Sequence, residues 1–253
     1  MRVKKYDVYG IGNAIVDYEI EVDNSFLGLN GLEKGLMTLA EQDIQRDLLH
    51  AAKSSIRKKQ AGGSVANSIV ALTQLGGSGF YSCKVASDID GIFYRDDLVK
   101  QGVDTNLFDG KLDDGETGKC LVMITPDAER TMSTFLGVSS NFSLSELHLD
   151  KLEDSHYLFL EGYLVSSPTG LVAMKEAKKR AKAAGTQIAL TFSDPSMVKY
   201  FGEQMNEVVG DGIDLLFCNE QEAKLYTGTD DLSQAIDNLK NISKSYVITL
   251  GSN

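Results

Sequence analysis

The sequence predicts an α/β fold: a mostly parallel sheet flanked by helices, with a small β sheet standing off it as a lid. From about residue 157 onward, apolar strand-like runs alternate regularly with segments of helical periodicity. Several half-exposed strand-like runs lie in the first 140 residues, between turn-rich pieces. With 253 residues, 42% hydrophobic and 24% charged, the chain can bury a substantial core. We therefore expect residues 1–253 to form one α/β domain.

The elements of the main sheet follow one another in the order expected for parallel strands. Residues 6–12 are an apolar run that ends on glycines, which predicts a buried strand. Residues 64–75 carry apolar side chains at helical spacing, with Ser64 as the N-cap and two glycines after the end. Further strands are expected at 157–161, 187–192, 214–218 and 245–250, and helices at 169–184, 197–209, 220–226 and 231–241. This alternation indicates a mostly parallel, Rossmann-like sheet with helices on both faces.

The lid is predicted from strands that have one wet face. Residues 16–22 alternate between apolar residues and acidic or polar ones. Residues 118–125 and 130–136 are similar runs, and turn-rich segments precede and separate them. We therefore expect lid strands within about 15–40 and 112–140.

Composition excludes several classes of function. The formal net charge is −11 and the basic residues are dispersed, so nucleic acid is not an expected partner. The three cysteines and three histidines lack the spacing of zinc or disulfide motifs. No apolar run suits a membrane span or a signal segment, so we expect a cytoplasmic protein that does not bind membranes. A nucleotide would have to be held by local amides and Mg²⁺, because the acidic excess repels polyphosphates.

The first motif carrying chemistry is Gly10-Ile11-Gly12-Asn13, followed by Asp17. It does not fit a dinucleotide fingerprint, because position 15 is Ile and a strand rather than a helix follows. The glycines would instead allow a tight turn that presents Asn13 and Asp17 to a polyhydroxylated ligand, since a carboxylate can accept two hydroxyl hydrogen bonds. Alternatively, Asp17 is only an outward residue of an amphipathic strand.

The second motif is Gly62-Gly63-Ser64 with Asn67, at the start of the helix predicted over 64–75. Two glycines allow a ligand to approach the backbone closely, the helix N-terminus supplies N–H donors, and Asn67 adds an amide one turn later. The alternative is a glycine turn before an ordinary amphipathic helix.

These motifs and several others form an ordered set. It comprises G-x-G-N-x-x-x-D at 10–17, G-G-S-x-x-N at 62–67, lid segments at 116–118 and 129–131, a carboxylate after a strand at Glu161 that is expected to face the substrate, N-x-x-E at 219–222 and I-T-L-G at 248–251. The set resembles the ribokinase-like family, also called the PfkB carbohydrate kinases, and within it the adenosine-kinase-like branch. The resemblance covers essentially the whole chain.

The resemblance implies an ATP-dependent phosphotransferase that phosphorylates a hydroxymethyl group of a sugar or nucleoside. It assigns acceptor binding to Asn13, Asp17, Gly62, Gly63, Ser64, Asn67 and Glu161. It assigns ATP to Thr249 and Gly251, and the Mg²⁺ ion to Asn219 and Glu222. The spacing of Asn219 and Glu222 fits a helix capping box equally well.

The sequence departs from the family pattern at one point. Members continue with a D-T-x-G-A-G-D segment whose last Asp deprotonates the attacking hydroxyl, and no Gly-Ala-Gly-Asp occurs in residues 1–253. We therefore expect the general-base Asp beyond Asn253 and a chain that is C-terminally incomplete. Loss of a general base costs about 10²–10⁴ in rate, so the alternative is a catalytically inactive sugar- or nucleoside-binding protein. The resemblance allows a monomer or a homodimer paired through the lid.

Overall fold

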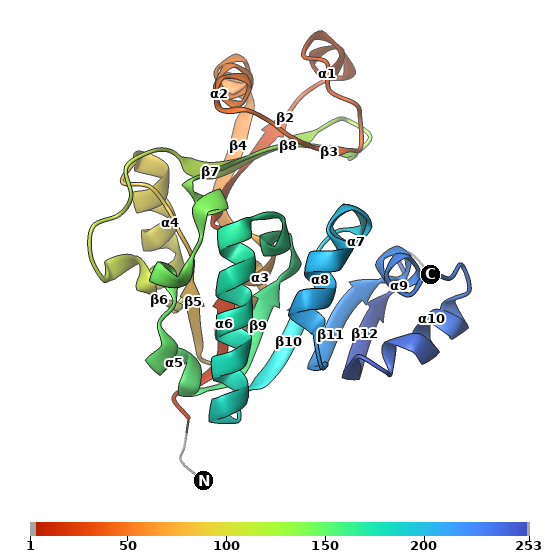
Figure 1. Cartoon of the computed structure of the whole chain (residues 1–253). Helices are drawn as coiled ribbons and strands as arrows, with labels where there is room; N and C mark the ends of the chain where they lie inside the picture. Colours follow the sequence, from red (N-terminus) through yellow and green to blue (C-terminus); the bar gives the residue numbers. More distant parts are fainter. Residues whose placement is uncertain (1–3, 252–253) are drawn as a thin grey trace.

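The computed structural model describes residues 4–251 and contains two sheets (Figure 1). The larger has seven strands in the order β12-β11-β10-β9-β1-β5-β6, and every neighbouring pair is parallel. Its strands are β1 (Tyr6–Ile11), β5 (Gly79–Ser82), β6 (Asp104–Thr105), β9 (Ser155–Glu161), β10 (Gln187–Thr191), β11 (Ile213–Asn219) and β12 (Ser243–Thr249). The mostly parallel sheet predicted from the sequence is confirmed.

Helices cover the larger sheet, with two apolar clusters between the layers. One cluster packs Tyr9, Leu158 and Leu190 of the sheet against α6 and its neighbours, and the other packs Tyr81 against α3 and α4. The helices are α3 (Ser64–Gln74), α4 (Ile89–Lys100), α5 (Leu149–Glu153), α6 (Pro168–Ala184), α7 (Pro195–Tyr200), α8 (Gly202–Val209), α9 (Glu220–Thr227) and α10 (Leu232–Leu239). Among residues 4–251, no helix is both long and apolar enough to cross a membrane.

Two sequence predictions about helices were wrong in detail. The helix expected over 197–209 is two helices, α7 and α8, because Phe201 leaves the helical region at φ −125° and ψ 31°. Helix α3 has Gly63 rather than Ser64 in the N-cap position, and Ser64 is its first helical residue.

The smaller sheet has five strands in the order β3-β8-β7-β2-β4 and stands above the body of the molecule, with α1 and α2 beyond it (Figure 1). Its strands are β2 (Ile15–Glu21), β3 (Met37–Leu39), β4 (Ile56–Gly62), β7 (Thr117–Ile124) and β8 (Arg130–Gly137), and the helices are α1 (Asn24–Leu29) and α2 (Gln42–Ala51). Strand β4, which pairs antiparallel with β2, was not predicted from the sequence.

Helix α4 fastens the smaller sheet to the body. Asp90, in its first turn, accepts a hydrogen bond from the Tyr18 hydroxyl at 2.5 Å and forms ion pairs with Lys59 at 2.6 Å and Lys119 at 3.3 Å. These three partners come from β2, β4 and β7. The carboxylate of Asp88 accepts the N–H and the hydroxyl of Thr117, at the start of β7. Acidic side chains at one helix end therefore bind three strands of the smaller sheet, and an apolar cluster that includes Val16, Leu121 and Tyr94 joins the same parts.

Candidate functional site

The two glycine motifs of the sequence meet at the carboxyl ends of β1 and β9. In this sheet the chain passes from β1 to β5 on one side and from β9 to β10 on the other, so the connections after β1 and β9 run in opposite directions. Ligands of open α/β sheets bind in the crevice outside such a switch point. The segment after β1 carries Asn13, β9 ends at Glu161, and β4 leads through Gly62 and Gly63 into α3.

The buried side chain of Glu161 joins the two glycine motifs through hydrogen bonds. Its Oε1 accepts hydrogen bonds from the backbone N–H of Asn13 at 3.0 Å and from Asn13 Nδ2 at 3.2 Å, and its Oε2 accepts the N–H of Val65 at 3.0 Å. The side chain is buried, and burial raises its pKa from 4.5 to about 7, although the hydrogen bonds act in the opposite direction. Both oxygens are thus directed at the protein, and neither faces open space.

The two glycines at the start of α3 are required by close contacts. A Cβ at Gly63 would lie 2.3 Å from the carbonyl oxygen of Asn13, and Gly63 has a φ of +107°, which L side chains rarely adopt. A Cβ at Gly62 would lie 2.3 Å from Asp17 Oδ2. A larger residue would therefore displace the Asn13 backbone at Gly63 and the Asp17 side chain at Gly62.

Asp17 is a half-buried carboxylate on β2 that lies directly beside Gly62. Within residues 4–251, no side chain or amide donates a hydrogen bond to it. Burial, with a smaller contribution from Glu19, raises its pKa from 3.8 to about 6. At neutral pH the group is ionised and both oxygens are available to a ligand.

Ser64 and Asn67 lie in the first turn of α3, which follows Gly62 and Gly63 directly. Ser64 is half-buried and Asn67 is exposed. The Asn67 backbone N–H closes the first helical hydrogen bond to the Gly63 carbonyl at 2.9 Å, while its side-chain amide contacts no partner in the described part of the chain. The structure therefore brings the sequence-predicted acceptor residues together, with Asn13, Gly62 and Glu161 buried and the others more exposed.

Asn219 and Glu222 form a complete capping box at the start of α9. Asn219 Oδ1 accepts the N–H of Glu222 at 2.8 Å, and the two Glu222 oxygens accept the Asn219 N–H and Nδ2, each at 2.9 Å. Burial raises the pKa of Glu222, and the charge of Asp194 adds to this effect. The helix capping box, which the sequence spacing fitted as well as a magnesium site, is thus present in the structure. It holds the Asn219 side chain in a fixed position at the end of β11.

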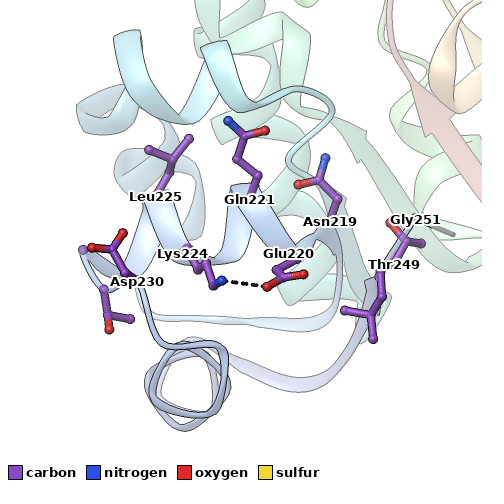
Figure 2. A pocket seen from close by; sticks show the side chains of 11 residues that line it. Asn219, Glu220, Gln221, Lys224, Leu225, Asp230, Thr249 and Gly251 are labelled. Carbon is purple, nitrogen blue, oxygen red and sulfur yellow. Dashed lines mark hydrogen bonds and ion pairs between the residues drawn. The ribbon is translucent and has the colours of Figure 1, made fainter. Parts of the chain in front are cut away.

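A cavity of about 730 Å³ lies between α9 and the segment after β12. Figure 2 shows Asn219, Thr249 and Gly251 on one side of it, Leu225 and Asp230 on the other, and the Lys224–Glu220 ion pair between them. Thr249 and Gly251, both predicted to bind ATP, are exposed. The volume is sufficient for a nucleotide, since ligand pockets are typically about 300–1,000 Å³.

A magnesium ion suits the donors at this edge only as a hydrated ion. Within residues 4–251, no three His, Cys, Asp or Glu side chains come together as a metal cluster. Asn219 and Glu222 offer one amide and one carboxylate, which already bind each other. Mg²⁺ commonly keeps several waters and uses one or two carboxylates plus substrate phosphates. The donor set fits that mode of binding.

Two residues near these sites were missed by the sequence analysis. Tyr163 follows β9, and its hydroxyl forms no hydrogen bond within the described residues. Burial raises the pKa of Tyr163, and the charges of Asp194, Glu161 and Glu222 add to this effect. The second is Ser193, in the turn after β10. Neither belongs to a sequence motif, and only the folded structure reveals them.

Comparison with known proteins finds similarity over most of the chain. The family model described as "pfkB family carbohydrate kinase" matches residues 40–253. An adenosine kinase structure from Sinorhizobium meliloti has 34% sequence identity and a TM-score of 0.86, and the match covers 98% of this chain and 75% of that one. The structure of a probable sugar kinase from Rhizobium etli CFN 42 has 27% identity and a TM-score of 0.89, covering 99% and 75% of the two chains.

Curated sequences give the same association with a shorter overlap. Guanosine-inosine kinase of Escherichia coli K12 is 26% identical over 239 residues, which is 91% of this chain and 55% of that protein. The chain thus spans about half the length of this relative.

Proposed function

The chain belongs to the pfkB family of carbohydrate kinases, and from that premise we propose that it is an ATP-dependent phosphotransferase whose acceptor is a nucleoside or sugar. The reaction would transfer the γ-phosphoryl group to a hydroxymethyl group. A nucleoside is the favoured acceptor, because relatives of this chain carry the names adenosine kinase and guanosine-inosine kinase.

The observation that supports the proposal most strongly is the free carboxylate of Asp17. An ionised, half-buried carboxylate without a donor is costly unless a ligand supplies one. Two hydroxyls of a ribose can both donate to it, and Gly62, which has no side chain, leaves the Asp17 oxygens uncovered on that side. Asn13, Gly63, Ser64 and Asn67 would complete the acceptor site, with Glu161 holding Asn13 and α3 in place.

We propose that the smaller sheet acts as a lid over the acceptor. Asp17 is part of β2, so a lid movement would carry this carboxylate with it and exclude water from the reacting groups. The acidic contacts from α4 to β2, β4 and β7 would then lie at the hinge.

The nucleotide would occupy the cavity beside α9, with Thr249 and Gly251 at its phosphates. Asn219, held by Glu222, would orient waters of a bound magnesium ion. When bound, that ion neutralises charge on the transferring phosphate. None of these residues is assigned to deprotonate the acceptor hydroxyl.

A phosphoryl-transfer assay tests the proposal. The protein is incubated with ATP, MgCl₂ and either a nucleoside or a sugar, and products are identified by mass spectrometry. A phosphorylated acceptor that forms only with Mg²⁺, and is lost in Asp17→Asn, supports a kinase. Acceptor binding without transfer would instead support an inactive binding protein, and neither binding nor transfer would refute both.

A further inference from the structure

Ser193 carries a buried hydroxyl to which no group of the described residues forms a hydrogen bond. Among residues 4–251, its Oγ is the single buried side-chain oxygen or nitrogen without a hydrogen-bond partner. Its neighbours in the same turn are engaged: Thr191 Oγ1 accepts the Ser193 N–H at 3.1 Å, and Asp194 Oδ1 accepts the N–H of Ser196 at 2.7 Å. An unpaired buried hydroxyl lowers the stability of the fold, so the presence of this one indicates a role other than stabilising the fold.

The backbone of Ser193 is also in an unfavourable conformation. Its φ is +70°, and Ala128 is the one other non-glycine residue with a positive φ in the described chain. Serine is strained there, whereas glycine would not be. Hydrogen bonds hold the turn in this shape, from Asp194 N–H to the Phe192 carbonyl at 2.9 Å and from Phe192 N–H to the Phe217 carbonyl at 3.0 Å. Strain of this kind occurs preferentially at functional sites.

Ser193 lies between the acceptor site and the nucleotide cavity. Thr191 is in register with Glu161 of β9 on one side and with Phe217 of β11 on the other. Ser193 follows two residues later, so at the carboxyl edge it lies between the β9 end and Asn219, the end of β11. A group that contacts the phosphoryl group in transit would occupy this position.

A second cavity, of about 260 Å³, makes that position accessible to a ligand. Ser193 lines it together with Thr191, Phe217, Cys218, Asn219, Glu222, Val247 and Thr249. Asn219 and Thr249, which are partners in the β11–β12 register, also line the larger cavity beside α9. The two cavities therefore adjoin, and phosphates extending over this pair of residues from the larger cavity would arrive at Ser193.

We propose that Ser193 Oγ, after rotation about χ1 into this cavity, donates a hydrogen bond to the terminal phosphate of a bound nucleoside triphosphate. The proposal rests on the proposed kinase function and adds to it a residue that binds the third phosphate. The part of the chain that the structure describes contributes no lysine or arginine to the lining of the smaller cavity but does contribute Glu222, so the terminal phosphate must arrive with its divalent cation. The contact is therefore specific for the magnesium complex of a triphosphate over a diphosphate.

The test combines nucleotide binding with stability in the absence of ligand. Ser193→Gly removes the hydroxyl and the strain, Ser193→Ala removes the hydroxyl alone, and Ser196→Ala is the matched control in the same turn. Calorimetry with Mg²⁺ gives the dissociation constants of AMP-PNP and ADP, and urea unfolding gives the midpoint without ligand. We expect both Ser193 variants to bind AMP-PNP about tenfold more weakly, since a hydrogen bond to a charged group contributes about that factor, and to bind ADP as the parent does.

We also expect the urea midpoint of Ser193→Gly to be higher than that of the parent. Ser196→Ala should keep the parent's ratio of AMP-PNP to ADP affinity. If the Ser193 variants keep that ratio while the parent binds nucleotide, the role of Ser193 is refuted and the kinase proposal stands. A lower midpoint for Ser193→Gly would also overturn the inference, because the hydroxyl would then stabilise the fold. If the parent binds neither nucleotide, the proposed function fails, and this inference fails with it.

Discussion

Replacing Glu161 with glutamine removes the buried charge that joins the two glycine motifs. Three N–H donors point at this carboxylate, from the Asn13 backbone, the Asn13 side chain and the Val65 backbone. Burial nevertheless raises its pKa from 4.5 to about 7. Glutamine has about the size and shape of glutamic acid, so Glu161→Gln keeps the side-chain volume and removes the ionisable group. It also replaces one of the two accepting oxygens with an NH₂ donor, which costs stability equally at every pH, so only the pH slope is compared.

The magnitude follows from the raised pKa of Glu161. Because this pKa is higher in the folded protein than in the unfolded chain, protonation of Glu161 favours folding. Its contribution to the free energy of unfolding is complete below about pH 4.5 and is lost as the pH rises through about 7. A pKa raised from 4.5 to about 7 corresponds to about 3 kcal/mol over that window. The free energy of unfolding of the parent should therefore fall by about 1.4 kcal/mol per pH unit across most of the window, and Glu161→Gln should abolish this part of the slope.

The assay is urea unfolding followed by circular dichroism at several pH values between about 4 and 8. Asp17→Asn is the control, because the pKa of Asp17 is raised only to about 6 and its contribution is lost at lower pH. The free energy of unfolding of the parent minus that of Glu161→Gln should be larger at low pH than at pH 8. If Glu161→Gln retains the parent's slope between about pH 6 and pH 7, the burial argument for Glu161 is refuted.

Three further predictions concern the acceptor site and its hinge. Acceptor affinity should weaken as the pH falls through about 6, because protonation of Asp17 removes a hydrogen-bond acceptor; affinity unchanged down to pH 5 would contradict its role. Gly63→Ala should lower the free energy of unfolding by about 3 kcal/mol through strain and a clash. Gly185→Ala, with φ +66° and open space around it, should cost about 1 kcal/mol, and equal losses would refute the clash. Asp90→Asn should destabilise by about 3 kcal/mol because two lysines lose their buried counter-charge, whereas the exposed Asp96→Asn should change stability by less than about 0.5 kcal/mol in the same urea assay.

Much of the larger sheet could be predicted from the sequence because its strands are short apolar runs separated by periodic helices. The pattern located β9 through β12 within about two residues of the observed ends. It failed at β4 (Ile56–Gly62), where Arg57, Lys58 and Lys59 interrupt any apolar alternation. That strand exists because it pairs with β2 and because Lys59 binds Asp90, which are tertiary contacts that a local pattern does not contain.

The candidate site was predictable in part for the same reason. Glycines and a helix start are local signals, so the meeting of Asn13 with Gly63 could be anticipated from the motifs. The direction of the Glu161 side chain, buried beneath the crevice, depends on which amides surround it after folding. Ser193 left no signal at all, because a positive φ and an unpaired hydroxyl are properties of the folded turn.

The most direct measurement of the central claim is calorimetric titration of the chain with adenosine, guanosine, inosine and free sugars. The parent should bind at least one of these at a single site, and Asp17→Asn should weaken that binding at least about tenfold by removing a charged hydrogen-bond acceptor. Glu21→Gln, an exposed carboxylate at the end of the same strand, should bind as the parent does. No binding of any acceptor, or equal affinities in the parent and Asp17→Asn, would contradict the assignment of this crevice as the acceptor site.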